Sequence, residues 1–293
     1  MKTITFYSYK GGAGRSSTTL NTLPYLVQSL HASANAPILV LDMDLDSAGM
    51  TYLLGLDAHF KDRYDVKSFL MGDENWSESP AASLEEHELY QHFAPGGELL
   101  GVDNNAVMFL GVDDAKPIDN NQMNGPKEGV FHKLNRFCRK NGIKAVVIDS
   151  SAGDQFSAVL STGAANDIVC CMRPTMQFRI GTFNYLHRLE KKTSEKRVVL
   201  LPTVVPNMDK IVDGEPQRAS AIRNIRERAE DLAIDEVCLD FVTEEVFGIN
   251  EVERFKWKEG VLFKIGLRRE LTDDEAEACK RYRKLANLLA EDE

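Results

Sequence analysis

The feature that most constrains the fold is a glycine-rich stretch between an apolar segment at residues 3–6 and a helical pattern that begins at Ser16. Glycine permits a tight turn, and a strand–turn–helix order directs successive backbone N–H groups toward one point, where the helix dipole also favours an anion. The stretch therefore predicts a phosphate-sized anion site between a strand and a helix. The candidate binding residues are Lys10, Gly11, Gly12, Ala13, Gly14, Arg15, Ser16 and Ser17.

Short apolar runs alternate with longer helical patterns along the rest of the chain. We expect strands, several of them buried on both faces, at residues 3–6, 37–42, 106–112, 144–149, 167–172 and 197–205. We expect helices at residues 16–32, with a bend at Pro24, and at 129–141, 182–192 and 218–231. This alternation predicts an α/β fold with a mostly parallel central sheet and helices on both faces.

No internal repeat and no linker divides the sequence, so we expect residues 1–293 to form a single domain. Residues 73–129 are acidic and rich in turn residues, and should be the most irregular part. Residues 272–291 open with Thr272 and Glu275 in a capping-box pattern and continue with apolar residues at helical spacing, which predicts a C-terminal helix packed on the core. The net charge of −10 is concentrated in the acidic segment, so a basic face elsewhere is not excluded.

The five cysteines form no CxxC pair and no metal-ligand spacing. Adjacent Cys170 and Cys171 lie in an apolar run, so we expect core thiols in a reducing cytosol. No run reaches the roughly 18 apolar residues of a membrane span, and Met1 leads directly into a strand pattern. These features predict a cytoplasmic protein.

Aspartates follow two of the apolar runs. Asp42 and Asp44 stand at the end of the run at 37–42, and Asp149 ends the run at 144–149. Parallel strands would bring these carboxylates to the edge of the sheet that carries the glycine-rich turn. Mg²⁺ prefers oxygen ligands, so a hydroxyl and nearby carboxylates suit a magnesium–nucleotide complex. For any single aspartate, capping of a turn is an alternative explanation. It explains less well why the glycine-rich turn and the two strand-end aspartate motifs occur together.

These motifs resemble those of one known family. KGGAGRSS resembles the deviant Walker A loop, KGGxGK[ST][ST], of the ParA/MinD family of P-loop ATPases. LDMDLDSAG, residues 41–49, resembles the second aspartate motif of that family, and VVIDSSAG, residues 146–153, resembles its Walker B motif. The order and spacing match from Met1 to about Pro206, and residues 239–263 are more loosely similar to the last strand and the loop before the final helix.

The resemblance implies ATP and Mg²⁺ as cofactors and a nucleotide-dependent homodimer that closes on ATP and reopens after hydrolysis. By position, Lys10 is the signature lysine that reaches the phosphates in the partner subunit, and Asp44 orients the attacking water; these two are the catalytic candidates. Ser16 is a magnesium ligand, Asp42 and Asp149 hold the magnesium shell, and the Ser17 hydroxyl contacts the α-phosphate.

Arg15 departs from the family pattern, which has lysine at this position. Arginine keeps the charge and can pair with phosphate bidentately, but it is planar, longer and forked. Because phosphoryl transfer depends on positioning, a displacement of about 1 Å can cost on the order of a hundredfold in rate. The site could be working, slowed or a relic. The other motif residues argue against a relic, and we favour a weak ATPase with a long-lived ATP-bound dimer.

The resemblance also indicates possible partners. Relatives act on DNA or on membranes, but this chain ends in KLANLLAEDE, whose terminal acids would be repelled by anionic lipid, so we expect no membrane attachment. Basic residues gather at 173–197 and 253–269 and could bind DNA non-specifically in a dimer, although solvated helix faces explain them slightly better. Adenine recognition rests on the resemblance, with Thr203, Pro206 or Asn207 as candidate contacts.

A second class of function stays open. The chain could be an ATP-sensing regulator or assembly factor with little or no hydrolysis and no DNA binding, and the acidic segment at 73–119 could then face an activating partner protein. Iron–sulfur relatives need cluster cysteines on loops, whereas Cys138, Cys170 and Cys171 lie in helix or strand patterns. A tyrosine-kinase relative would carry a tyrosine-rich tail, and only Tyr282 lies near the end.

Overall fold

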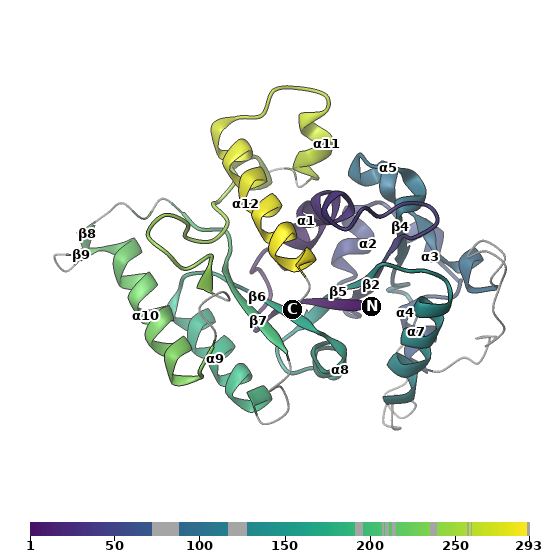
Figure 1. Ribbon diagram of the computed structural model, residues 1–293, viewed down its shortest axis with the longest axis horizontal. Helices are drawn as coiled ribbons and strands as arrows, with labels where there is room; N and C mark the ends of the chain where they lie inside the picture. The colour runs from purple at the N-terminus through teal and green to yellow at the C-terminus, as the bar shows by residue number, and fades with distance from the viewer. Residues whose placement is uncertain are drawn as a thin grey trace.

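The computed structural model describes residues 1–71, 88–116, 128–190, 196–206, 208, 211–212, 215–234, 239–256, 258 and 260–291. In these residues a seven-stranded sheet with the order β3-β4-β2-β5-β1-β6-β7 forms the centre of the molecule (Figure 1). All neighbouring strands pair in parallel except β3 and β4. The strands are β1 (Lys2–Ser8), β2 (Ile38–Met43), β3 (Ala94–Pro95), β4 (Val107–Leu110), β5 (Ala145–Ala152), β6 (Asp167–Met172) and β7 (Arg197–Pro202).

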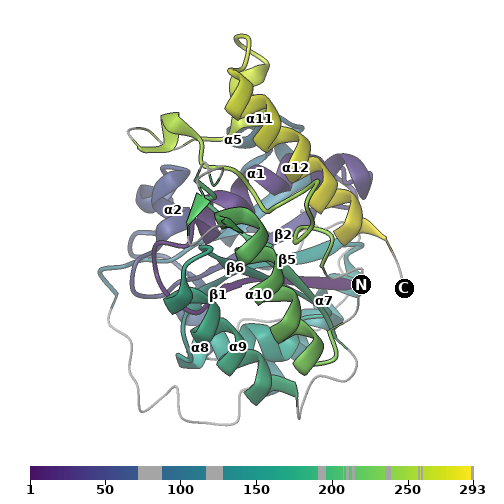
Figure 2. The ribbon, with the colours of Figure 1, turned by 90° about the vertical axis from the view of Figure 1, so that its left-hand side faces the viewer.

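Helices cover both faces of the sheet. Helices α1 (Arg15–Ser29) and α12 (Asp273–Ala290) lie side by side on one face, and α8 (Phe156–Ala164) and α9 (Met176–Glu190) lie on the other (Figures 1 and 2). Because both faces are covered, β2 and β6 are buried along their whole length. The other helices are α2 (Gly49–Leu53), α3 (Asp57–Phe60), α4 (Val66–Met71), α5 (Gly97–Leu100), α7 (Glu128–Lys140), α10 (Gln217–Asp231) and α11 (Leu262–Gly266).

Shorter elements complete the described part of the chain. Strands β8 (Ile211–Val212) and β9 (Glu215–Pro216) form a small antiparallel pair. The 3-10 helices are η2 (Glu88–His92), η3 (Asn104–Ala106) and η5 (Glu253–Lys256).

The expected α/β fold with a mostly parallel sheet is confirmed, and the six expected strands are all present. Strand β6 has the expected limits, whereas β5 runs on to Ala152 and β7 ends at Pro202 instead of residue 205. The expected helix at 182–192 begins earlier, at Met176, and α1 continues through Pro24. Helix α8 was not predicted, because its serine, threonine and glycine residues have low helix propensity.

The expected C-terminal helix is confirmed as α12. Thr272 is its N-cap, and Thr272 and Glu275 form the expected capping box. One face of the helix packs against the rest of the fold through Ala278, Tyr282 and Leu285, all of which are buried. Of the acidic segment at 73–129, residues 73–87 and 117–127 lie outside the described residues, and residues 88–116 contain only short helices and the two strands β3 and β4.

The cysteines in the described part of the chain are buried thiols, as expected. Cys138, Cys170, Cys171 and Cys279 are free and buried, and Cys238 lies outside the described residues. No helix in the described ranges combines the length and hydropathy needed to cross a bilayer.

Candidate functional site

The glycine-rich turn connects the carboxyl end of β1 to the first residue of α1. Gly12 and Gly14 have φ angles of 80° and 72°, in the left-handed region that favours glycine, and Gly14 is the N-cap of α1. A Cβ atom on Gly14 would lie 2.9 Å from Cγ2 of Val204. Gly11 has neither a positive φ nor a close neighbour. Two of the three glycines are therefore needed for the backbone path itself.

Side chains outside the turn donate hydrogen bonds to two of its carbonyl groups. Thr203 Oγ1 donates to the carbonyl of Ala13 at 2.6 Å, and Arg173 Nε donates to the carbonyl of Gly12 at 2.8 Å. Within the described ranges, by contrast, no hydrogen bond is donated by the backbone N–H groups of residues 11–17. A run of free donors at a helix N-terminus is a site for an anion with several acceptor oxygens.

Arg15 is buried at the start of α1 and contacts the strand-end aspartates. Its Nε donates to Asp149 Oδ1 and its Nη2 to Asp44 Oδ2, both at 2.7 Å. Burial acts to lower the pKa of Arg15, but the two carboxylates outweigh it and hold the pKa above its ordinary value. The guanidinium is therefore charged, and it joins the first turn of α1 to β5 and to the residues that follow β2.

Asp42 and Asp149 are direct neighbours in the pairing of β2 with β5. Asp42 Oδ2 accepts hydrogen bonds from the backbone N–H of Thr51 at 2.9 Å and from its hydroxyl at 2.7 Å. Burial, followed by the charge of Asp149, raises the pKa of Asp42 to about 7. Burial likewise raises the pKa of Asp149, against the opposing effect of Arg15. Two neighbouring buried carboxyl groups resist ionising together unless a cation joins them.

One atom of this pair is left open. Asp149 Oδ2 is buried and has no hydrogen-bond partner among the described residues. The described residues contain no group of three or more histidine, cysteine, aspartate or glutamate side chains placed to hold a metal. The predicted set of two carboxylates and the Ser16 hydroxyl is smaller than such a group, so the magnesium site stays a prediction.

Lys10 lies apart from these aspartates. Its side chain is exposed, and Nζ donates to Gln177 Oε1 at 3.0 Å, at the start of α9. Arg15, Asp44 and Asp149 are thus in direct contact, and Asp42 is adjacent to them, while Lys10 faces solvent. An exposed position on the turn is where a residue that reaches another subunit would stand.

A cavity of about 260 Å³ opens beside the turn. It is bounded by Gly12 and Gly14, by Ser17 and Thr18 of α1, and by the segment 249–256. Ser17 Oγ and Asn250 Oδ1 are buried there without a hydrogen-bond partner in the described chain. The cavity therefore combines free polar atoms with apolar walls, next to the row of free N–H groups.

This cavity changes the candidates for base recognition. The hydroxyl of Thr203 donates to the turn and its side chain is fully buried, and its expected contact with a base stays a prediction. Pro206 does not line the cavity, and Asn207 lies outside the described residues. Asn250, which was not among the candidates, presents an acceptor. The only sequence signal for it was the loose similarity of residues 239–263 to the family's last strand and loop.

Together, the mostly parallel sheet, the glycine-rich turn after the interior strand β1 and the following helix define a P-loop-type α/β fold. No protein-family model matches the sequence, and no curated protein has a matching sequence. The structure is nevertheless similar to solved structures along nearly the whole chain. One is an ATP complex of a variant of McdA from Cyanothece, with a TM-score of 0.63, 17% identity, and 100% of this chain and 98% of the other covered.

Two further matches are MinD structures. MinD in the MinC:MinD cell division complex of Aquifex aeolicus has a TM-score of 0.59 and 14% identity, with 97% of this chain and 95% of the other covered. The septum site-determining protein MinD of Pyrococcus horikoshii, complexed with Mg-ADP, has a TM-score of 0.58 and 17% identity, with 97% and 94% covered. The chain therefore has the fold of the ParA/MinD-type P-loop ATPases, as the resemblance implied.

Proposed function

We propose that the chain binds Mg·ATP at the glycine-rich turn and acts as a slowly hydrolysing, nucleotide-dependent dimerisation switch. The observation that carries this proposal is the run of backbone N–H groups at residues 11–17 that have no acceptor within the described chain. These donors lie at the N-terminus of the 15-residue helix α1, next to a cavity of about 260 Å³ with two free buried polar atoms. Triphosphate oxygens and a base would satisfy both sets of groups.

The proposal includes a divalent cation at the same site. Ser16, Asp42 and Asp149 would hold Mg²⁺, and the buried Oδ2 of Asp149 has no hydrogen-bond partner among the described residues. The bound ion would supply charge neutralisation for the phosphates. Asp42 must be ionised for this role, and a neighbouring cation would offset the burial that now favours its protonated form.

Slow hydrolysis follows from the contacts of Arg15. Asp44, the residue expected to orient the attacking water, already accepts from Arg15 Nη2 at 2.7 Å and from Ser47 Oγ at 2.5 Å. Arg15 cannot contact a phosphate with the same N–H groups that it donates to Asp44 and Asp149. Hydrolysis therefore requires a rearrangement of a buried ion pair, which adds to the barrier.

The dimer proposal rests on the surface around the turn. Phe156, Met176 and Tyr52 are exposed large apolar residues, with 37%, 68% and 48% of their surface accessible. They belong to the helices that follow β5, β6 and β2, so they border the edge of the sheet that carries Lys10. Exposed apolar residues around a nucleotide site are suited to burial against a second copy of the chain.

The regulator alternative draws support from the basic segments. In the segment 253–269, Lys256 is paired with Glu253 at 2.7 Å and Arg269 with Glu275 at 2.6 Å. In the segment 173–197, Arg188 is paired with Asp154 and Arg197 with Asp167. Fewer unpaired basic side chains are therefore available to bind the phosphate backbone of DNA than the sequence indicated. A switch that acts on a partner protein thus becomes the second candidate, and DNA binding loses part of its support.

The test is the oligomeric state of the purified full chain with ATP and Mg²⁺, with ADP, and without nucleotide. We expect a dimer only with ATP, measured by light scattering after size exclusion. A monomer in all three conditions would contradict the switch. A salt-titrated mobility-shift assay with DNA then separates the two candidates, because a partition-type switch binds DNA only in its ATP state and a regulator does not bind it in either state.

A further inference from the structure

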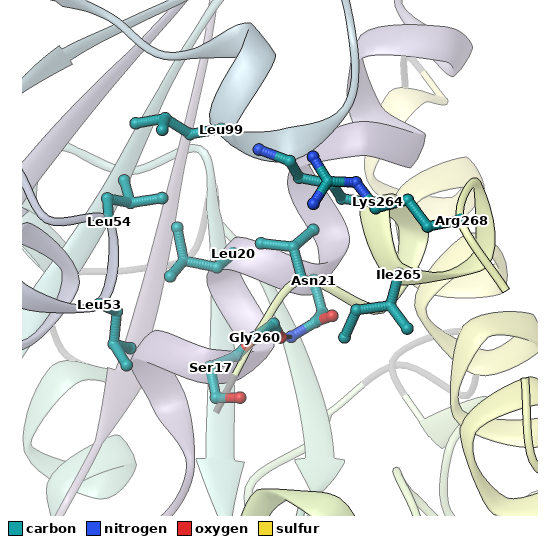
Figure 3. Close-up of a pocket in the computed structure, with 11 residues that line it drawn as sticks. Ser17, Leu20, Asn21, Leu53, Leu54, Leu99, Gly260, Lys264, Ile265 and Arg268 are labelled. Atoms are coloured by element: carbon teal, nitrogen blue, oxygen red, sulfur yellow. Dashed lines mark hydrogen bonds between the residues drawn. The ribbon is translucent and has the colours of Figure 1, made fainter. Parts of the chain in front are cut away.

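A second cavity, of about 270 Å³, lies between α1, α2, α5 and α11 (Figure 3). Its volume is close to the lower end of known ligand pockets, which begin at about 300 Å³. The lining is mostly apolar and comes from four separate parts of the chain. The apolar side chains shown there include Leu20, Leu53, Leu54, Leu99 and Ile265.

Two cations stand at this apolar cavity. Lys264 of α11 and Arg268 just beyond it both line the cavity, and Figure 3 shows their charged ends reaching over its Leu99 side. Neither forms an ion pair within the described ranges, unlike the nearby Arg269, which is paired with Glu275. No acidic side chain is among the described residues that line the cavity. Two like charges beside an apolar surface leave a place for an anion.

We propose that this cavity binds a small anion with an apolar body, in the class of medium-chain carboxylates. The carboxylate would lie between Lys264 and Arg268, and the hydrocarbon would cover the leucines. At about 30 Å³ for each water-sized group, the volume holds roughly nine non-hydrogen atoms, which is close to the size of a carboxylate with seven or eight carbons.

The cavity is connected to the nucleotide turn through one residue. Ser17 lines both cavities. Asn21, also in the lining, donates from Nδ2 to the carbonyls of Ser17 at 2.9 Å and Gly260 at 3.1 Å, and its Oδ1 accepts from the N–H of Leu262 at 2.7 Å. A ligand that contacts Gly260 therefore acts on the backbone that carries Ser17. This link rests on the proposed nucleotide site, and it couples the two ligands reciprocally.

The binding test is an isothermal titration of the full chain, free of nucleotide, with octanoate as the probe. We expect saturable binding to one site, with 1-octanol and octylammonium binding at least about tenfold more weakly because they cannot neutralise the two cations. The double variant Lys264→Gln, Arg268→Gln should lose at least about tenfold in octanoate affinity. Lys280→Gln, which removes an exposed lysine of α12 outside the cavity, should bind like the unchanged chain.

Several results would overturn the proposal. These are no octanoate binding, equal binding by the double variant, or equal binding of octylammonium. Binding of an acidic, leucine-rich peptide in place of octanoate would identify the cavity as a protein docking site and also refute it. Both substituted side chains are on the surface side of the cavity, and an unchanged melting temperature confirms that the variant is folded.

The coupling is tested separately by measuring ATP affinity with and without saturating octanoate. We expect a shift of at least about twofold, and an unchanged affinity would refute the coupling. Failure of the proposed nucleotide site gives a different result: ATP would not bind in either condition, while octanoate binding without nucleotide would persist.

Discussion

Arg15 donates a hydrogen bond from Nε to Oδ1 of Asp149 at 2.7 Å, and the side chains of both residues are buried. The arginine occupies the sequence position of the usual phosphate-binding lysine, yet in this structure its charge is directed to the carboxylates behind the turn. The backbone N–H groups of the turn have no acceptor in the described chain, so the proposed anion binding would not require Arg15. The contacts of Arg15 therefore support the proposal that the chain binds ATP but hydrolyses it slowly.

Replacement of Arg15 by lysine should accelerate ATP hydrolysis. A lysine has a single charged nitrogen and cannot contact Asp44 and Asp149 in the way that two guanidinium nitrogens do. Asp44 would be released to orient water, and we expect phosphate release to rise on the order of tenfold. Single-turnover phosphate release and the lifetime of the ATP-bound dimer are the measurements.

The matched control for that change is Arg188→Lys, since Arg188 forms an exposed ion pair with Asp154 away from the turn. It should leave both quantities unchanged. If Arg15→Lys also left the rate and the dimer lifetime unchanged, the bridge from Arg15 to the carboxylates would not be what limits hydrolysis.

Replacement of Lys10 by alanine should separate nucleotide binding from dimerisation. Lys10 is exposed, and in the described chain its side chain hydrogen-bonds only to Gln177. Its loss should therefore not affect folding. We expect ATP affinity to change by less than about threefold, while the ATP-dependent dimer is lost. Light scattering and a fluorescent-ATP titration measure the two effects. Gln177→Ala should still dimerise, and a Lys10→Ala chain that dimerises normally would contradict the assignment.

The glycines of the turn should differ in their tolerance to alanine. At Gly14, with φ of 72° and Val204 2.9 Å from a new Cβ, alanine should reduce the free energy of unfolding by about 1–2 kcal/mol and weaken ATP binding. At Gly11, where nothing lies within 4 Å, alanine should change it by less than about 0.5 kcal/mol. Urea denaturation measures both, and equal effects at the two positions would refute this reading of the turn.

Stability at acid pH should depend on the cap of α12. Hydrogen bonds from Arg269, ahead of the opposing effect of burial, lower the pKa of Glu275 below its usual 4.5. A lowered carboxyl pKa contributes stability above the unfolded pKa and loses it as pH falls through the folded pKa. Glu275→Gln should therefore reduce the free energy of unfolding by about 1 kcal/mol at pH 7, and the difference should shrink as the pH falls from 4.5 through the lowered folded pKa. A difference that does not depend on pH would contradict the ionised cap.

The sheet and the turn were predictable because their signals are local. Continuously apolar runs gave the strands, and the glycines at positions 12 and 14 marked a backbone with positive φ. The capping box of Thr272 and Glu275 likewise gave the start of α12 to the residue. Local patterns of this kind depend only on residues that are close in sequence, so they can be recognised before the fold is known.

The contacts of the site were less predictable because they join distant segments. The two carboxylate partners of Arg15, Asp44 and Asp149, are 29 and 134 residues away, and a flexible side chain can choose among several acceptors. Asn250 became a candidate only when residues 249–256 were found beside the turn. The cavity of Figure 3 is built by helices that are distant in the sequence, and no motif marks it.

Calorimetric titration of the full chain with ATP in the presence of Mg²⁺ tests the central claim most directly. We expect saturable heat with one ATP per chain, weakened when Mg²⁺ is withheld and when Gly14 is replaced by alanine. If no heat of association were detected and the melting temperature were the same with and without Mg·ATP, the turn would not be a triphosphate site and the proposed switch would be wrong.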